Sequence, residues 1–447
     1  FKCEFSMINH HTAHAYSVFP LSGFSSSAVL IVDGAGEKET ISIWRHENQS
    51  LTHCKSYSIP NSLGLFYGAI TQYLGFSEHD EEWKVMGWAP YGEPRFYDQL
   101  KQVIKTQYLE ISEKYFQGQD GLFPWYTKEM VSLLGVPPRG HDAEFDVVYA
   151  DIAASAQLVL EEAFLQLAQE ARDLTGETRL CMAGGVALNG KATGVIASKA
   201  IFDEIFVQPA SADDGTAIGA ALWLASKRGE VIVQDFPTLY QGPQYSADDI
   251  SAAIARFGSG WRILELADNA IDEYIADQLV NERIVGWFQG SSEFGPRALG
   301  NRSILATPCS PAIKDTLNEK IKFRESFRPF APSVLAEYAS EYFSGLIDNA
   351  YYMNRIVQVR PEMQGLIPAV THVDGTARVQ LVTDSHNERF YRLLKKFHAR
   401  SGVPVLLNTS FNVKGEPIVE TPDDALRCFR KTGIDVLVMG KFVIEKV

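Results

Sequence analysis

Cysteine is scarce in this chain, which has five in 447 residues. The five are widely spaced, and no two of them form a C-x-x-C pair. This arrangement argues against a disulfide framework or a cysteine zinc site and indicates free thiols in a reducing compartment. No apolar run reaches the roughly 18 to 20 residues of a membrane helix, and no secretory signal pattern is visible. We therefore expect a cytoplasmic protein without a membrane partner.

Positive charge is also in short supply. The chain has 41 lysines and arginines against 55 aspartates and glutamates, which gives a net charge of -14. Such a surface repels phosphate backbones at long range, so nucleic acid is not expected as a partner, although a local basic pocket could still hold a nucleotide. The apolar fraction of 46% is typical of a globular protein. The length exceeds one ordinary core, so we expect two domains.

Hydrophobic periodicity predicts an α/β first domain. Residues 9–19 have the pattern of a short helix, and residues 149–176 that of a long amphipathic helix that ends at Gly176. Strands that run into a glycine-rich or polar turn are expected within residues 27–46, 179–190 and 205–229.

A stretch punctuated by proline and glycine, residues 230–246, is typical of a linker. Helix and strand patterns then alternate again, at residues 246–258, 268–282 and 283–290. We therefore expect a first domain at residues 1–232 and a second α/β domain at residues 233–447.

Three of the ten histidines fall within five positions, at His10, His11 and His14. On a helix, positions four apart share a face, so His10 and His14 are neighbours and His11 turns aside. Two imidazoles at this spacing can share one metal ion, although surface histidines are the simpler alternative. A carboxylate ligand must come from elsewhere, and Asp33 and Asp213 are the candidates, because both follow strands beside glycine. Turn-capping is the alternative role for these two aspartates.

Three glycine-rich turns follow strands in the first domain: "DGAGE", "GGVALN" and "DDGTAIG". Glycine lets a phosphate approach the backbone, and a helix start offers free N–H groups, although hairpins and helix ends use the same residues. Three such turns in one domain resemble the phosphate-binding arrangement of actin-like ATPase folds. The predicted nucleotide- or phosphate-binding residues here are Gly34, Gly36, Gly184, Gly185, Asn189 and Gly215.

The second domain concentrates positive charge despite the acidic balance of the chain. The segment "KIKFRESFRPFAPS" interleaves lysines and arginines with phenylalanines, so part of it must be buried. Buried cations need anionic partners, which a bound phosphate or carbamoyl phosphate would supply. A salt-bridged surface is the alternative. The predicted anion-binding residues are Arg297, Arg302, Lys322, Arg324, Arg328, Arg378, Asn408, Ser410 and Asn412.

Taken in order, nine segments resemble the O-carbamoyltransferases of the NodU/TobZ kind over essentially the whole chain. They are "NHHTAHAYS", "VDGAGE", "WKVMGWAPYG", "GGVALN", "DDGTAIGAAL", "EFGPRALGNRSILA", "RPFAP", "HVDGTARVQ" and "LNTSFNVKGEPIV". The resemblance implies an actin-like (ASKHA) domain, similar to the tRNA threonylcarbamoyl-transfer subunit, followed by a YrdC-like α/β domain.

The resemblance also implies a reaction. Carbamoyl phosphate and ATP, with Mg²⁺, would form carbamoyladenylate in the YrdC-like domain, and a hydroxyl of a small natural product would then take the carbamoyl group in the actin-like domain. The implied metal ligands, with iron(II) as the metal, are His10, His14, Asp33 and Asp213. The implied catalytic residues are Arg297, Lys322, Arg378 and Ser410. A homodimer is left open.

Family members open with a strand pair that carries a "HDSAA"-type motif, whose histidine is a proposed general base. No such segment precedes Phe1. We expect the native chain to have it, because an incomplete actin-like lobe would expose a sheet edge. Residues 115–140 are the loop expected to contact the acceptor. A tRNA threonylcarbamoylation enzyme and a non-catalytic nucleotide-binding regulator are the alternative functions.

Overall fold

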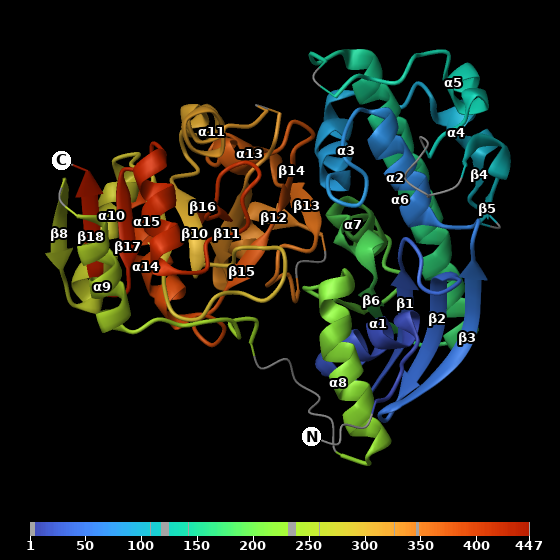
Figure 1. The fold of residues 1–447 in the computed structure, drawn as a ribbon, viewed down its shortest axis with the longest axis horizontal. Helices are drawn as coiled ribbons and strands as arrows, with labels where there is room; N and C mark the ends of the chain where they lie inside the picture. Colours follow the sequence, from blue (N-terminus) through green and yellow to red (C-terminus); the bar gives the residue numbers. More distant parts are fainter. Residues whose placement is uncertain are drawn as a thin grey trace. The chain divides into compact units, whose positions relative to one another are not determined.

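The chain divides into two compact units, residues 1–236 and 237–447 (Figure 1). The computed structural model describes residues 5–107, 109–117, 125–141, 143–230, 238–258, 260–325, 327–345 and 348–446. The expected domain boundary, between residues 232 and 233, falls in a stretch outside the described residues. Both units combine helices with β-sheets, so the predicted α/β class is confirmed.

The N-terminal unit contains a five-stranded sheet. Its strands are β1 (Ser26–Val32), β2 (Glu39–Glu47), β3 (Ser50–Ser58), β6 (Arg179–Ala183) and β7 (Glu204–Val207). Their order is β3-β2-β1-β6-β7, with β1, β2 and β3 antiparallel and β6 and β7 parallel to β1. All but the first residue of β1 are buried, as in a strand covered on both faces. The sequence pattern did not predict β3, whose residues are mostly polar and only partly buried.

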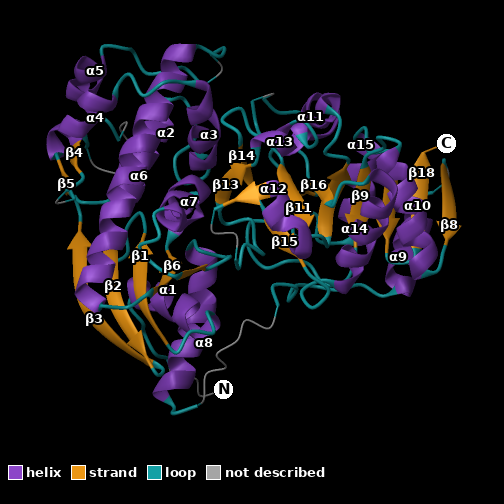
Figure 2. Ribbon diagram, turned by 180° about the vertical axis from the view of Figure 1, so that it is seen from behind, coloured by secondary structure: helices purple, strands orange, loops and turns teal. Residues whose placement is uncertain are grey.

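The helices of this unit cover the sheet and continue beyond its end (Figure 2). They are α1 (His10–Val18), α2 (Leu63–Tyr73), α3 (Glu82–Trp88), α4 (Tyr97–Val103), α5 (Lys128–Leu134), α6 (Val147–Thr175), α7 (Gly190–Ser198) and α8 (Thr216–Lys227). A short hairpin joins β4 (Ile104–Lys105) to β5 (Glu110–Ile111). The long helix α6 packs along β1 and β2, whereas α1 packs against β1, β6 and α8. As predicted, α6 ends at Gly176, which has the left-handed backbone conformation that glycine adopts easily.

The C-terminal unit contains an eight-stranded mixed sheet. Its strands are β8 (Trp261–Glu265), β9 (Val285–Phe288), β10 (Arg302–Ala306), β11 (Ala331–Leu335), β15 (Gln380–Val382), β16 (Val405–Ser410), β17 (Val436–Met439) and β18 (Phe442–Lys446). Their order is β15-β11-β16-β10-β9-β17-β18-β8. A smaller sheet pairs β12 (Phe343–Ser344), β13 (Ile356–Val359) and β14 (Thr376–Arg378). The register of β10 on β16 places Ser303 opposite Ser410.

The helices of this unit are α9 (Ala247–Phe257), α10 (Asp268–Val280), α11 (Pro311–Leu317), α12 (Ala339–Tyr342), α13 (Pro361–Gln364), α14 (Glu388–Ser401) and α15 (Pro422–Lys431). α10 packs on α14, where the buried Asp272 forms ion pairs with Arg389 and Arg392. α11 continues into a π-helical turn, residues Asn318–Lys322. Within the described part of the chain, no helix is both long enough and apolar enough to span a bilayer.

Candidate metal centre and anion site

The two histidines of the predicted pair project from one face of α1. Asn9 caps the helix by accepting a hydrogen bond from the backbone N–H of Thr12 at 3.1 Å. The Glu37 carboxylate accepts from the Asn9 side-chain amide at 2.8 Å and from the backbone N–H of His10. With the helix start fixed in this way, the Nε2 atoms of His10 and His14 lie 3.1 Å apart.

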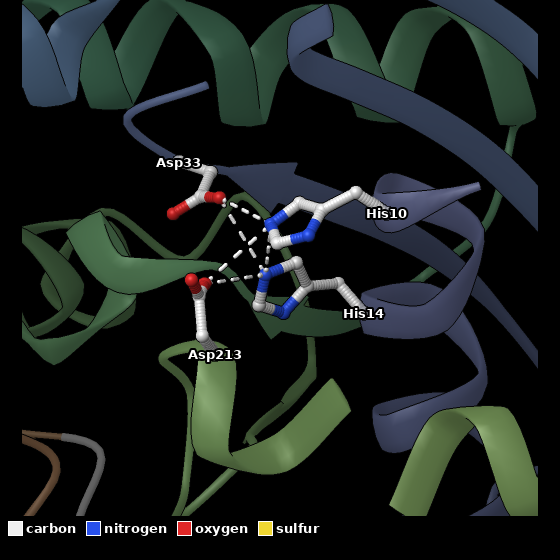
Figure 3. Close-up of side chains that lie close together, drawn as sticks. All are labelled: His10, His14, Asp33 and Asp213. Atoms are coloured by element: carbon white, nitrogen blue, oxygen red, sulfur yellow. Dashed lines mark hydrogen bonds and ion pairs between the residues drawn. The ribbon is translucent and has the colours of Figure 1, made fainter. Parts of the chain in front are cut away.

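Two carboxylates from distant parts of the chain complete the cluster (Figure 3). Asp33 directly follows β1, and its Oδ2 lies 2.8 Å from His10 Nε2 and 3.5 Å from His14 Nε2. Its other oxygen accepts a hydrogen bond from the backbone N–H of Gly185 at 2.9 Å. Asp213 lies in the turn before α8, and its Oδ1 is 3.5 Å and 3.6 Å from the same two nitrogens.

Burial and charge differ sharply across this cluster. The His14 side chain is fully buried, whereas that of Asp213 is 77% exposed. Burial opposes a charge on His14, but hydrogen bonds to Asp213 and Asp33 outweigh it and raise the pKa of this imidazole. Burial alone would raise the pKa of Asp33, but hydrogen bonds from His10 and His14 hold it well below its usual range. The hydrogen bond with His14 also lowers the pKa of Asp213, so both carboxylates are ionised at neutral pH.

The donor set fits a divalent metal ion. One nitrogen from each of His10 and His14 and one oxygen from each of Asp33 and Asp213 all lie within 4.8 Å of one another. Ligand atoms bound about 2.0 to 2.2 Å from a common ion lie about 3 to 3.5 Å apart, close to the separations found here. Two imidazoles with carboxylates suit iron or zinc.

His11 lies on a different side of α1 from this pair. Its Nδ1 is 2.9 Å from the Ser42 hydroxyl on β2, and the ring is fully buried. The ring centroids of His11 and His14 are 6.5 Å apart. Burial lowers the pKa of His11 to about 4, so this imidazole is neutral at physiological pH. It is therefore not placed to ligate an ion shared by His10 and His14.

The predicted phosphate-binding turns of the N-terminal unit include or adjoin residues of the metal cluster. Most of their glycines pack closely against neighbouring protein atoms. A Cβ at Gly184 would lie 2.3 Å from the Val32 carbonyl oxygen, and one at Gly215 would lie 2.1 Å from that of Ala210. A Cβ at Gly36 would meet the ring and Cβ of His10, whereas Gly34 has open space on that side.

Asn189 has a capping role in the same region. It caps α7 by accepting from the Ala192 N–H, and its amide bonds to Gln157 of α6. The phosphate-binding role of all these turn residues stays a prediction.

In the C-terminal unit, Lys322 ends the π-helical turn and is buried. Its ammonium donates to the backbone oxygen of Ser410, to the Asn412 side-chain oxygen at 2.7 Å and to the Asn412 backbone oxygen at 3.1 Å. The Ser410 hydroxyl donates to the same Asn412 side-chain oxygen at 2.7 Å. Burial, together with the charges of Arg324 and Arg328, lowers the pKa of Lys322 well below its ordinary value.

Three buried arginines add positive charge to this region, and among the described residues two of them, Arg297 and Arg378, have no carboxylate that compensates it. Burial lowers the pKa of Arg297 to about 10. Burial and the charges of Arg297 and Arg324 lower that of Arg378. Among the described residues, the Nε atoms of Arg297 and Arg378 are buried and have no hydrogen-bond partner. Arg324 bonds to the Asn318 side chain at 2.8 Å and lies over the Phe330 ring. An anion bound here would gain from charges that the fold leaves unneutralised.

The other predicted residues of this site have protein partners. Arg302 is fully buried over the Phe288 ring and donates to four backbone oxygens, those of Pro243, Gln289, Gly290 and Asn301. Asn408 is buried in the sheet and bonds to Ser333 and Gln380 at 3.0 Å. Arg328 forms an ion pair with Glu325 at 3.2 Å. Their role toward an anion stays a prediction.

The sequence analysis did not identify Gly219, a glycine that lets the helix after Asp213 pack directly on the helix of His10 and His14. A Cβ at Gly219 of α8 would lie 1.8 Å from the Ala13 carbonyl oxygen on α1, so the two helices touch through this glycine. The second glycine of "GTAIG" was the available signal, because small residues allow helix backbones to approach closely. Part of the expected acceptor loop, residues 118–124, lies outside the described residues.

Comparison with known families accounts for nearly all of this chain. The profile described as "Carbamoyltransferase N-terminus" matches residues 1–222, and that described as "Carbamoyltransferase C-terminus" matches residues 276–446. The chain belongs to the carbamoyltransferase family. It is therefore a transferase enzyme, as the sequence analysis predicted.

Relatives of this carbamoyltransferase include a nodulation protein and an O-carbamoyltransferase. Nodulation protein NolO of Bradyrhizobium diazoefficiens is 40% identical over 445 residues, which cover 98% of this chain and 79% of that protein. The 3'-hydroxymethylcephem-O-carbamoyltransferase of Amycolatopsis lactamdurans is 38% identical over 290 residues, which cover 64% of this chain and 52% of that protein. An uncharacterized protein of Synechocystis is 40% identical over 98% of this chain and 75% of its own length. These relatives confirm the resemblance to the NodU/TobZ kind.

Proposed function

We propose that this carbamoyltransferase is an ATP-dependent enzyme that transfers a carbamoyl group to a hydroxyl of a small natural product. The name of the Amycolatopsis relative specifies a hydroxymethyl acceptor, which supports an oxygen nucleophile on a small molecule. We further propose that the N-terminal unit is actin-like and the C-terminal unit YrdC-like. The order β3-β2-β1-β6-β7, with three antiparallel strands continued by two parallel ones, supports the first assignment. The second follows from the family resemblance.

The observation that carries this proposal is the unneutralised charge of the C-terminal unit. Among the described residues, Arg297 and Arg378 each bury an Nε without an acceptor, and Lys322 is buried among neutral oxygens. The charge of Arg324 acts on both Arg378 and Lys322. Leaving a buried donor unsatisfied costs about 1 to 3 kcal/mol, and more for a charged group. A ligand that brings several anionic oxygens would recover that cost. ATP and carbamoyl phosphate both do so, and we assign their binding to this site.

In the first half-reaction, carbamoyl phosphate, ATP and one water would give carbamoyladenylate, pyrophosphate and phosphate. Water would first attack the phosphorus of carbamoyl phosphate and break its bond to the carbamoyl oxygen, which gives carbamate and phosphate. A carbamate oxygen would then form a bond to the α-phosphorus of ATP, and the bond from that phosphorus to the pyrophosphate oxygen would break. The arginines and Lys322 would bind the phosphate groups and offset the charge that develops on the leaving oxygens. Mg²⁺ bound to ATP would also offset the charge that develops on the phosphate oxygens.

In the second half-reaction, which we assign to the N-terminal unit, the acceptor hydroxyl would attack the carbamoyl carbon and AMP would leave. His10, His14, Asp33 and Asp213 would hold the metal ion, and two imidazoles with carboxylates support iron(II). When bound, such an ion supplies a positive charge that can polarise an oxygen. The Gly185 N–H holds Asp33 so that its other oxygen faces the histidines.

Isotope exchange between pyrophosphate and ATP tests the proposal. The wild-type enzyme should catalyse exchange only when carbamoyl phosphate is present. Arg378→Ala should reduce the rate about 10²- to 10³-fold, the usual effect of removing one donor to developing charge. RNA should be unnecessary, which separates this function from threonylcarbamoylation of tRNA. Exchange that does not depend on carbamoyl phosphate would refute the proposed first half-reaction.

A further inference from the structure

The loop between β9 and β10 carries Arg297, and a single carboxylate organises it. One oxygen of Glu293 accepts hydrogen bonds from three backbone N–H groups, those of Leu299 at 2.7 Å, Asn301 at 2.8 Å and Arg302 at 3.2 Å. Its other oxygen is buried and has no partner among the described residues. The carboxylate therefore ties the start of the loop to its end.

Two carbonyl oxygens of the same loop accept hydrogen bonds from side chains outside the loop. The Leu299 oxygen accepts from the Gln380 amide at 2.8 Å and from the Tyr240 hydroxyl at 2.9 Å. The Gly300 oxygen accepts from the Trp287 indole at 2.9 Å. Gly300 has a φ of 109°, which a residue with a side chain rarely adopts. The backbone after Arg297 is thus fixed on both its donor and its acceptor sides.

The charge of Glu293 is directed to backbone amides and away from the arginine that the loop carries. Burial is what lowers the pKa of Arg297, and in the described part of the chain no carboxylate raises it. Arg302, by contrast, feels the negative charge of Glu293. A carboxylate that paired with Arg297 would compete with an incoming anion, whereas this one shapes the loop and leaves the guanidinium available.

We propose that Glu293 is a positioning residue that holds Arg297 in place to receive an anionic oxygen of the substrate. This inference rests on the proposed function of the site. The proposed role requires an acceptor oxygen at the end of a side chain as long as that of glutamate, and it does not require the negative charge. Two substitutions separate these properties. Glu293→Gln keeps the oxygen and removes the charge, whereas Glu293→Asp keeps the charge and withdraws the oxygen by one methylene.

Exchange between pyrophosphate and ATP in the presence of carbamoyl phosphate is the first readout. Glu293→Gln should stay within about threefold of wild type. Glu293→Asp and Glu293→Leu should lose about 10²-fold, because misplacing a catalytic group by about 1 Å has that effect. In an Arg297→Ala background, Glu293→Asp should cause no further loss, since coupled residues are not additive. A Glu293→Gln loss equal to that of Glu293→Asp would overturn the inference and indicate a role for the charge.

Asp435 provides a matched control. It is a carboxylate that accepts from a backbone N–H, that of Ile284 at 2.7 Å, at the opposite end of β9. Asp435→Leu should lower thermal stability without changing exchange or pyrophosphate affinity. If it lowers pyrophosphate affinity as much as Glu293→Asp does, the effect of Glu293 is merely structural and the inference fails.

Calorimetric titration with inorganic pyrophosphate separates this inference from the proposed function. If the wild type shows no exchange while Arg297→Ala and Glu293→Asp weaken pyrophosphate binding equally, the proposed reaction fails and the positioning role of Glu293 stands. If Arg297→Ala weakens binding and Glu293→Asp does not, Glu293 does not position Arg297, and the proposed reaction is unaffected.

Discussion

At the scale of residues, the two sites handle charge in opposite ways. In the metal cluster, Asp33 and Asp213 lie within 3.6 Å of the two imidazoles, so carboxylate oxygens and imidazole nitrogens gather at one place. In the anion site, Arg297 and Arg378 have no carboxylate partner among the described residues and carry an uncompensated charge. The first arrangement suits a metal cation that stays bound to the protein, and the second suits a substrate anion that binds and dissociates.

His14→Ala should abolish stoichiometric metal binding, whereas His11→Ala should retain most of it. His14 presents Nε2 to both carboxylates, but His11 bonds to Ser42 away from them. Loss of a residue that merely orients a ligand costs about 10- to 100-fold in metal affinity, so loss of a ligand should cost at least that much. Elemental analysis of the purified variants measures the content. Equal loss in both variants would contradict the assignment of ligands.

Ser410→Ala should keep weak carbamoyladenylate formation, about 10²- to 10³-fold below wild type. In the described structure, the Ser410 hydroxyl donates to Asn412 and accepts from Lys322, and no histidine or carboxylate is hydrogen-bonded to it as a base. A nucleophilic serine must give its proton to a base, whereas this hydroxyl directs its proton to the Asn412 amide oxygen, which is not a base. We therefore expect the hydroxyl to act as a donor to a substrate oxygen. Mass spectrometry after a single turnover checks this, and a carbamoylated Ser410 peptide would refute it.

At the scale of elements, the metal cluster depends on how closely α1 and α8 approach. Ala13 and Ser17 of α1 contact the backbone of α8 at Gly219. The turn that carries Asp213 leads directly into α8. A displacement of α8 therefore moves Asp213 away from the two histidines, which are fixed on α1.

Gly219→Ala should therefore destabilise the protein and weaken metal binding together. The added Cβ would lie 1.8 Å from the Ala13 oxygen, so the helices must separate. Overpacking of this kind costs about 1 to 3 kcal/mol, and we expect metal affinity to fall at least about tenfold. Urea unfolding and metal titration measure the two effects. Ala221→Leu, on the exposed side of α8, is the control and should change neither. Normal metal affinity in Gly219→Ala would contradict this coupling.

The local pattern of the sequence predicted the parts of the site that depend on one element. His10 and His14 are neighbours because a helix brings positions four apart together, and Asp33 follows a strand that its apolar run predicted. The hydrogen-bond partners of Arg302 and Glu293 could not be predicted in this way. Whether an arginine side chain donates to a phosphate or to backbone oxygens depends on loops that are distant in the sequence.

At the scale of the whole molecule, the two candidate sites lie in separate compact units. The metal cluster draws all four of its residues from residues 1–236, and the anion site draws all of its residues from 237–447. Each cluster lies beside the largest sheet of its own unit: Asp33 follows β1, and Ser410 ends β16. This separation predicts that the two proposed half-reactions can be disabled one at a time.

Asp213→Ala should leave the carbamoyl phosphate-dependent exchange of pyrophosphate within about threefold of wild type and should abolish carbamoylation of the acceptor. Lys322→Ala should abolish both, because the acceptor step needs the carbamoyladenylate made in the first. Exchange is measured with labelled pyrophosphate. Transfer is measured by mass spectrometry of metabolites from the native host, as a gain of one carbamoyl group. Supplying carbamoyladenylate directly should restore transfer to Lys322→Ala and not to Asp213→Ala. If Asp213→Ala removes exchange as completely as Lys322→Ala does, the two half-reactions share one site and the assignment of roles to the two units is wrong.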